Sequence, residues 1–186
     1  MLAKRLFDIF FSLLALILTG WIILFFALLA TIDTRKSGFF LQKRVGQYGK
    51  LFTIYKLRSM TFTLNGQKHI SALGRFLRKS KLDEFPQFLN ILLGQMSFVG
   101  PRPDVPGYYD KLQGSQREIL KLKPGLTGPA SLKYRNEEFI LSSMQEPLKY
   151  NDEVLFPDKV LINLEYQKKR TLELDIKILF YTFFLR

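Results

Sequence analysis

The feature that most constrains the fold is an uncharged apolar run from Ile9 to Ile32, "IFFSLLALILTGWIILFFALLATI". As one helix, a run of this length can cross a hydrocarbon core of about 30 Å. A cleaved signal peptide has an apolar core of only about 7–15 residues followed by a small-residue cleavage site, and this segment matches neither property. The sequence therefore predicts a membrane helix near the N-terminus.

Basic residues stand on both sides of this run. Two precede it and four follow it: Lys4, Arg5, Arg35, Lys36, Lys43 and Arg44. Because positive residues favour the cytoplasmic side, the segment is either a single span with the main domain in the cytoplasm or a broken helix that enters and returns. Thr19-Gly20 is a weak indication of a break, since Gly costs about 1 kcal/mol relative to Ala in a helix. Both interpretations place the following domain on the cytoplasmic side.

The composition narrows the possible chemistry. The formal net charge of +12 indicates an anionic partner such as nucleic acid, an anionic membrane or a phosphorylated substrate. The absence of cysteine excludes disulfides, zinc–thiolate sites and thiol nucleophiles. His69 is the only histidine and is predicted to lie in a surface loop, so a multi-histidine metal site is also excluded. An active site must be built from carboxylates, Arg, Lys, hydroxyls and backbone.

The rest of the chain is predicted to be one α/β domain, mostly helical with a short β-hairpin. Residues 39–45 and 51–58 are expected as strands, residues 71–80 as an amphipathic helix, and a second helix should run from Pro86 to about Gly94. "MSFVGPRPDVPGYY" and "LKPGLTGPASLKYRN" are expected to be loops. The tail "LELDIKILFYTFFLR" fits an interfacial helix or a core helix. Residues 1–36 are assigned to the membrane helix and 37–186 to a catalytic domain, with the tail taken as interfacial.

The stretch "SKLDEFPQFLN" places two carboxylates, Asp83 and Glu84, just before Pro86. Proline is tolerated in the first turn of a helix, so both acids should lie at or next to a helix N-terminus. There they can complement the helix dipole, which is worth about 0.3–1 kcal/mol, or they can be ionised catalytic groups. The local pattern alone favours the capping interpretation.

Several basic residues lie near expected loops: Lys56, Arg58, Arg75, Arg78, Arg102 and Lys123. A solvated basic face near anionic lipid would explain many of them. Arg102 differs because Pro101 and Pro103 restrict its backbone, and a fixed guanidinium suits bidentate phosphate binding. Together with the carboxylate pair and the membrane segment, this pattern indicates phosphoryl transfer with Mg²⁺ and a lipid substrate. Nucleic acid fits poorly, since no binding motif is present.

Long motifs in order resemble the monotopic phosphoglycosyl transferases, a bacterial sugar transferase family. They are "KRLFDIFFS", "QKRVGQYGKLFTIYKLRSM", "LGRFLRKSKLDEFPQFLNILLGQMSFVGPRP", "KPGLTGPASLKYRN" and "LELDIKIL", which together cover nearly the whole chain. The resemblance implies transfer of a sugar-1-phosphate from a UDP-sugar to a polyprenyl (undecaprenyl) phosphate, giving UMP and a polyprenyl-diphosphate sugar. This would be the first membrane step of glycoconjugate or polysaccharide assembly.

The resemblance also implies roles for individual residues. Asp83 would be the nucleophile that carries a covalent phospho-sugar, with Mg²⁺ assisting, and Glu84 would support Asp83 or the metal. Arg78 and Arg102 match family positions that hold phosphate, and Lys56 and Arg58 are further candidates. The implied location is the cytoplasmic face of the bacterial inner membrane, on a re-entrant helix. The family breaks that helix at a Ser-Pro pair, whereas this chain has "LTGW".

The alternative hypothesis is a non-catalytic, membrane-tethered module that binds anionic lipid or glycan-assembly partners through its basic face. The two hypotheses differ in what they require of Asp83, because only the enzyme needs its carboxylate. The sequence does not indicate the sugar, the downstream pathway or the oligomeric state.

Overall fold

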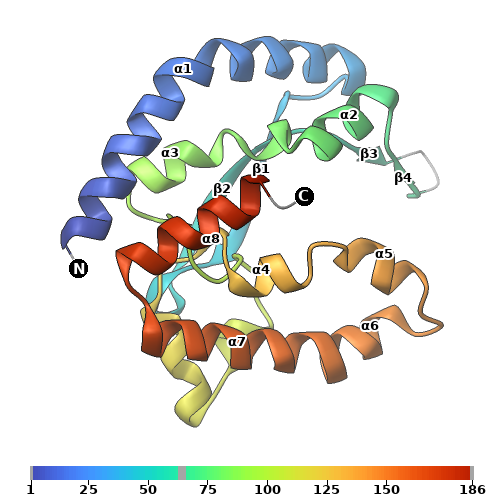
Figure 1. Cartoon of the computed structure of the whole chain (residues 1–186). Helices are drawn as coiled ribbons and strands as arrows, with labels where there is room; N and C mark the ends of the chain where they lie inside the picture. The colour runs from blue at the N-terminus through green and yellow to red at the C-terminus, as the bar shows by residue number, and fades with distance from the viewer. Residues whose placement is uncertain (1, 63–65, 185–186) are drawn as a thin grey trace. The chain divides into compact units, whose positions relative to one another are not determined.

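The computed structural model describes residues 2–62 and 66–184, and they are mostly helical with small two-stranded sheets (Figure 1). The chain divides into two compact units. The first unit contains Met1–Lys43 and Phe52–Gly94, and the second contains Arg44–Leu51 and Gln95–Arg186. This is a division by packing, and the assignment of residues 1–36 to a membrane segment and 37–186 to a catalytic domain stays a prediction.

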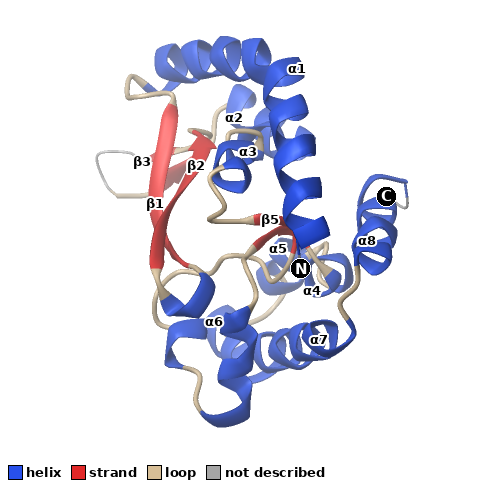
Figure 2. Cartoon of the chain, turned by 90° about the vertical axis from the view of Figure 1, so that its left-hand side faces the viewer, coloured by secondary structure: helices blue, strands red, loops and turns tan. Residues whose placement is uncertain are grey.

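Helix α1 (Leu2–Thr34) is the longest element of the first unit and the one helix of the described residues that is long and apolar enough to cross a membrane. Figures 1 and 2 both show its axis changing direction about midway. Near the middle of the helix, Thr19 Oγ1 donates a hydrogen bond to the carbonyl of Ala15 at 2.6 Å, a back-bond of the kind that often bends helices. The helix continues through Gly20, and the re-entrant arrangement stays a prediction.

Most of the apolar surface of α1 is uncovered. Its large exposed side chains include Leu6, Phe10, Ile17, Leu18, Trp21, Leu24, Phe25, Leu28 and Ile32. Ile23 and Ala27 instead pack inward with Leu57 and Leu77. An exposed apolar surface of this extent is typical of an interaction with lipid or with another protein.

The short helix α3 (Gln87–Leu92) packs against the N-terminal part of α1. Arg5 of α1 joins them, because its Nη1 donates to the carbonyl of Ile91 and its Nη2 to that of Leu92, each at 2.7 Å. These carbonyls lie in the last turn of α3, and that of Ile91 also accepts from the Gly94 N–H at 2.9 Å. Arg5 therefore has a structural role besides contributing to the basic flank.

The predicted hairpin is confirmed as β1 (Phe39–Val45) paired with β2 (Leu51–Leu57). The predicted amphipathic helix is also confirmed as α2 (Ala72–Ser80), capped by Ser71 Oγ, which accepts from the Gly74 N–H at 2.9 Å. Leu77 is fully buried, but Phe76 is half exposed beside the ring of Phe26. The first unit also contains the antiparallel pair β3 (Thr61–Phe62) and β4 (Lys68–His69), and His69 is exposed.

The second unit is built around two short strands where the sequence predicted only loops. β5 (Ser97–Val99) and β6 (Gly125–Thr127) pair in parallel, with Ser97 opposite Gly125 and Val99 opposite Thr127. A Cβ on Gly125 would lie 2.1 Å from the Gly100 nitrogen, so glycine permits this close approach of the two backbones. Stretches rich in Gly and Pro favour loops by local propensity, and the backbone contact overrides that propensity here.

The second unit also contains several α-helices, of which the last in the chain contacts both strands. They are α4 (Pro129–Lys133), α5 (Glu137–Ser142), α6 (Pro147–Tyr150), α7 (Phe156–Lys169) and α8 (Leu172–Phe184), with a π-helical turn at Asn151–Leu155 before α7. The buried core comprises Val45, Val99, Tyr109, Leu112, Ile119, Leu120, Leu122, Val160, Tyr166 and Ile178.

Helix α8 combines both properties predicted for the tail. Asp175 and Ile178 are buried, whereas Ile176, Phe180, Phe183 and Phe184 are exposed. One side of α8 therefore belongs to the core of the second unit, and its interfacial role stays a prediction.

Candidate active site

The carboxylate pair lies in a tight turn between α2 and α3. Lys81 adopts a left-handed conformation (φ 61°) after α2, and Leu82–Glu84 form a 3-10 turn. Pro86 then precedes the first residue of α3, as its position in the sequence predicted. Asp83 and Glu84 are only 7% and 8% exposed, so they do not form a solvated helix cap.

Glu84 is paired with Lys56 of β2. The Lys56 Nζ lies 2.9 Å from Glu84 Oε1, and both side chains are largely buried. Asn90 fixes the strand beside α3, because its Oδ1 accepts from the Tyr55 N–H at 3.1 Å and its Nδ2 donates to the Thr53 carbonyl at 2.7 Å. Two predicted site residues, Lys56 and Glu84, are thus held together by the packing of α3 on β2.

The surroundings of the Asp83 carboxyl group differ from those of Glu84. Its Oδ1 is buried and has no hydrogen-bond partner among the described residues. Burial raises the pKa of the Asp83 carboxyl above its usual 3.8 and the Glu84 carboxylate raises it further, whereas Lys56, Arg78 and Lys81 lower it. A buried acceptor without a partner costs about 1–3 kcal/mol, and such groups are concentrated where ligands bind.

The donor set fits a divalent cation held partly by substrate. Among residues 2–62 and 66–184 no group of three or more carboxylate or histidine side chains is arranged to hold a metal alone. Mg²⁺, however, is commonly bound through one or two carboxylates together with substrate phosphates. The buried, unpartnered Oδ1 of Asp83 is the oxygen most available for this role, since Glu84 already pairs with Lys56.

The predicted phosphate-binding residues have different surroundings. Arg78, on the last turn of α2, is half-buried and close enough to Asp83 to lower its pKa. Arg58 instead uses its guanidinium to bind backbone, with Nε donating to the Ser37 carbonyl at 2.6 Å and Nη2 to the Phe39 carbonyl at 3.1 Å. These bonds hold the start of β1, and phosphate binding by Arg58 stays a prediction.

Arg102 belongs to the second unit, directly after β5. Its side chain is exposed, while the flanking Pro101 and Pro103 are buried. The Gly125 N–H donates to the Pro101 carbonyl at 2.8 Å, and Arg44 Nη1 donates to the Pro103 carbonyl at 3.3 Å. The backbone on both sides of Arg102 is therefore anchored, as the two prolines predicted.

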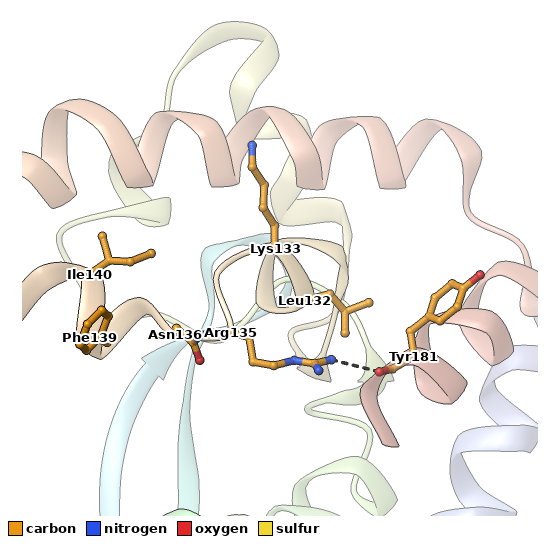
Figure 3. Close-up of a pocket in the computed structure, with 7 residues that line it drawn as sticks. All are labelled: Leu132, Lys133, Arg135, Asn136, Phe139, Ile140 and Tyr181. Atoms are coloured by element: carbon orange, nitrogen blue, oxygen red, sulfur yellow. Dashed lines mark hydrogen bonds between the residues drawn. The ribbon is translucent and has the colours of Figure 1, made fainter. Parts of the chain in front are cut away.

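A hollow in the second unit is lined by none of the predicted site residues. It lies between α4, α5 and α8 and is lined by Leu132, Lys133, Arg135, Asn136, Phe139, Ile140 and Tyr181 (Figure 3). Arg135 crosses it to donate to the Tyr181 carbonyl at 3.0 Å, and Lys133 pairs with Asp158. Both basic side chains that line the hollow are thus bound to the protein itself.

The sequence analysis missed three polar residues of the first-unit site. Lys81 contributes positive charge near Asp83, and Gln87 and Asn90 are almost completely buried. Gln87 and Asn90 follow Asp83 by four and seven residues, a spacing that places all three on one side of a helix. That spacing is present in the sequence itself.

Comparison with known proteins identifies related sequences over the whole chain. The family described as "Bacterial sugar transferase" matches residues 1–185. A "UDP-glucose:undecaprenyl-phosphate glucose-1-phosphate transferase" of Klebsiella pneumoniae is 36% identical over 99% of this chain and 40% of its own length. An "Undecaprenyl-phosphate galactose phosphotransferase" of Salmonella typhimurium is 33% identical over 96% of this chain and 39% of its own length. This chain thus spans about two-fifths of the length of these relatives.

A shorter relative matches over most of both sequences. The "Exopolysaccharide production protein PSS" of Rhizobium leguminosarum is 37% identical over 70% of this chain and 73% of its own length. The similarity therefore extends to a protein of size closer to that of this chain.

Proposed function

Because the chain belongs to the bacterial sugar transferase family, we propose that it transfers a sugar-1-phosphate from a UDP-sugar to undecaprenyl phosphate. The relatives' names describe such transfers with glucose and galactose. The observation that carries the proposal is the buried, unpartnered Oδ1 of Asp83 beside the Lys56–Glu84 pair. A non-catalytic module that only binds lipid does not require a buried carboxylate oxygen without a hydrogen-bond partner.

In the proposed first step, an Asp83 carboxylate oxygen attacks the phosphorus that carries the sugar. A bond forms between the Asp83 oxygen and this phosphorus. The bond from the same phosphorus to the bridging oxygen of the diphosphate breaks, and the bridging oxygen leaves with the bond's electron pair as part of UMP. Asp83 then carries the sugar-1-phosphate as an acyl phosphate. In the second step, an oxygen of undecaprenyl phosphate attacks the same phosphorus and releases the carboxylate. This acceptor is already ionised, so the second step needs no general base.

The basic side chains around Asp83 have two roles in this scheme. Lys56, Arg78 and Lys81 favour the ionised carboxylate that must attack, since each lowers the pKa of Asp83. They also balance the negative charge of the diphosphate. Asp83 and Glu84 would hold Mg²⁺ with the substrate phosphates, and the cation would supply further charge neutralisation. Arg102, on its anchored loop, is proposed to bind a substrate phosphate.

The test is intact-protein mass spectrometry after mixing with Mg²⁺ and a panel of UDP-sugars, without lipid acceptor. We expect a mass gain of one sugar-phosphate in the wild type and none in Asp83→Asn. Adding undecaprenyl phosphate should remove the adduct and produce the lipid-linked sugar. Appreciable turnover by a homogeneous Asp83→Asn preparation would contradict the nucleophile assignment.

We further propose that α1 is re-entrant and that both of its ends lie on the cytoplasmic face of the inner membrane. The exposed apolar surface of α1, its bend and its two basic flanks support this arrangement. Because the chain has no cysteine, Ala3→Cys and Lys36→Cys variants each offer a single thiol. An impermeant maleimide should label neither in intact cells and both after permeabilisation. Labelling of position 3 alone in intact cells would indicate a full span.

A further inference from the structure

Two buried polar atoms at the entrance to α3 have no hydrogen-bond partner among the described residues. They are Asp83 Oδ1, an acceptor, and Gln87 Nε2, a donor. The Gln87 side chain is more completely buried than that of Asp83, with the whole residue only 2% exposed. The backbone is helical from Leu82 to Leu92, so residues four apart lie on the same side of this segment.

Asn90 provides the comparison within the same helix. It is completely buried, and its Oδ1 and Nδ2 bind the backbone of Tyr55 and Thr53 in β2. The Asn90 amide is therefore satisfied at both ends by the protein itself. The Gln87 donor lacks a partner, and leaving a buried donor unpaired costs about 1–3 kcal/mol.

A ligand that satisfies both orphan atoms must have a particular chemistry. It must offer an electrophilic or cationic centre to the carboxylate oxygen of Asp83 and an acceptor oxygen to the N–H of Gln87. A phosphoryl group has both, because its phosphorus is electrophilic and its oxygens are anionic. The positive charges of Lys56, Arg78 and Lys81 near Asp83 favour such an anionic group.

We propose that Gln87 is a further substrate-binding residue whose side-chain amide donates a hydrogen bond to an oxygen of the phosphoryl group that reacts at Asp83. The inference rests on the proposed function and adds a residue to it. Negative charge accumulates on the phosphoryl oxygens as Asp83 attacks, so a donor fixed there stabilises the transition state more than the ground state. Gln87 forms no covalent bond and exchanges no proton in this role.

The test compares Gln87→Met with Asn90→Leu. Met preserves the length and burial of Gln87 while removing its polar atoms. Turnover is measured as UMP release with undecaprenyl phosphate and a panel of UDP-glucose, UDP-galactose and UDP-N-acetylgalactosamine, and stability as the thermal midpoint of the same preparations. We expect Gln87→Met to lower kcat on the order of 10²-fold, the cost of one transition-state donor, without lowering the midpoint. Asn90→Leu should lower the midpoint.

The outcomes separate this inference from the proposed function. Turnover by the wild type and none by Asp83→Asn would support the function on its own. Wild-type turnover by Gln87→Met, or a parallel loss of stability and activity like that expected of Asn90→Leu, would then overturn the role of Gln87 alone. No turnover by the wild type with any donor of the panel would overturn both.

Discussion

Asp83 of the first unit and Asp175 of the second are both buried, and their side chains are satisfied differently. Asp175, in the first turns of α8, is 2% exposed and accepts a short hydrogen bond from the Tyr166 hydroxyl. Asp83, in the turn before α3, is 7% exposed and has an oxygen without a partner. Burial alone therefore does not identify a functional carboxylate. The informative property is whether the fold itself satisfies the buried group.

The two units also differ in the polar contacts around these aspartates. In the second unit, Tyr166 also contacts the carbonyl of Val99 in β5, and the Thr127 and Thr182 hydroxyls are 2.9 Å apart. These contacts join α8 to β5, which precedes Arg102, and to β6, which is part of the "GLTG" segment. In the first unit, Asp83 and Gln87 each have a buried polar atom without a hydrogen-bond partner among the described residues, and in the second unit the buried Oδ1 of Asn163 is in the same state. The chemistry proposed above takes place beside Asp83 in the first unit, and the proposed phosphate-binding residue Arg102 belongs to the second.

The largest expected effect separates the two aspartates. Asp83→Asn should lower transfer on the order of 10³-fold or more, because it removes the nucleophile. Asp175→Ala should instead lower the free energy of unfolding by about 1–3 kcal/mol, since the buried Tyr166 hydroxyl loses its acceptor. Urea titration and turnover per folded molecule measure the two effects. The comparison fails if Asp175→Ala is as inactive as Asp83→Asn while remaining fully folded.

A smaller effect should separate two arginines. Arg102→Lys should lower kcat/KM by about 10–10²-fold, because a lysine cannot bind phosphate through two N–H groups. Arg58→Lys should mainly lower stability, by about 1 kcal/mol, because it removes bonds to the Ser37 and Phe39 carbonyls. The two variants are matched in charge. A loss of kcat/KM in Arg58→Lys with unchanged stability would instead support the predicted phosphate-binding role of Arg58.

The smallest effect concerns pH. The folded protein holds the Asp83 proton more tightly than the unfolded chain, so this group's contribution to stability falls as pH rises above about 3.8 through the raised pKa. Asp83→Asn removes that dependence. Its thermal midpoint relative to wild type should therefore be higher at pH 7 than at pH 4. Melts of both proteins in detergent provide the measurement, and an advantage that is larger at pH 4 would contradict the raised pKa.

Local patterns in the sequence were sufficient to predict several secondary-structure elements. The β1–β2 hairpin and α2 are confirmed close to their predicted bounds, because alternation and amphipathic spacing act over neighbouring residues. The glycine-rich strands β5 and β6 were missed because their pairing depends on residues about 28 positions apart in the chain. The amphipathic pattern of α2 did not indicate that Leu77 is fully buried while Phe76 is half exposed beside Phe26 of α1, because that difference depends on tertiary packing.

By itself the sequence determined the apolar N-terminal helix, the family and the identity of the carboxylate pair, because each is encoded in contiguous residues. The local pattern favoured a capping role for Asp83 and Glu84, whereas the longer motifs that resemble the family favoured a catalytic role. The tertiary structure decided how the two acids differ: Lys56 of a distant strand satisfies Glu84, while Asp83 and Gln87 are buried with orphan atoms. Satisfaction of a buried polar group depends on what packs against it, and that is a property of the fold rather than of any short segment.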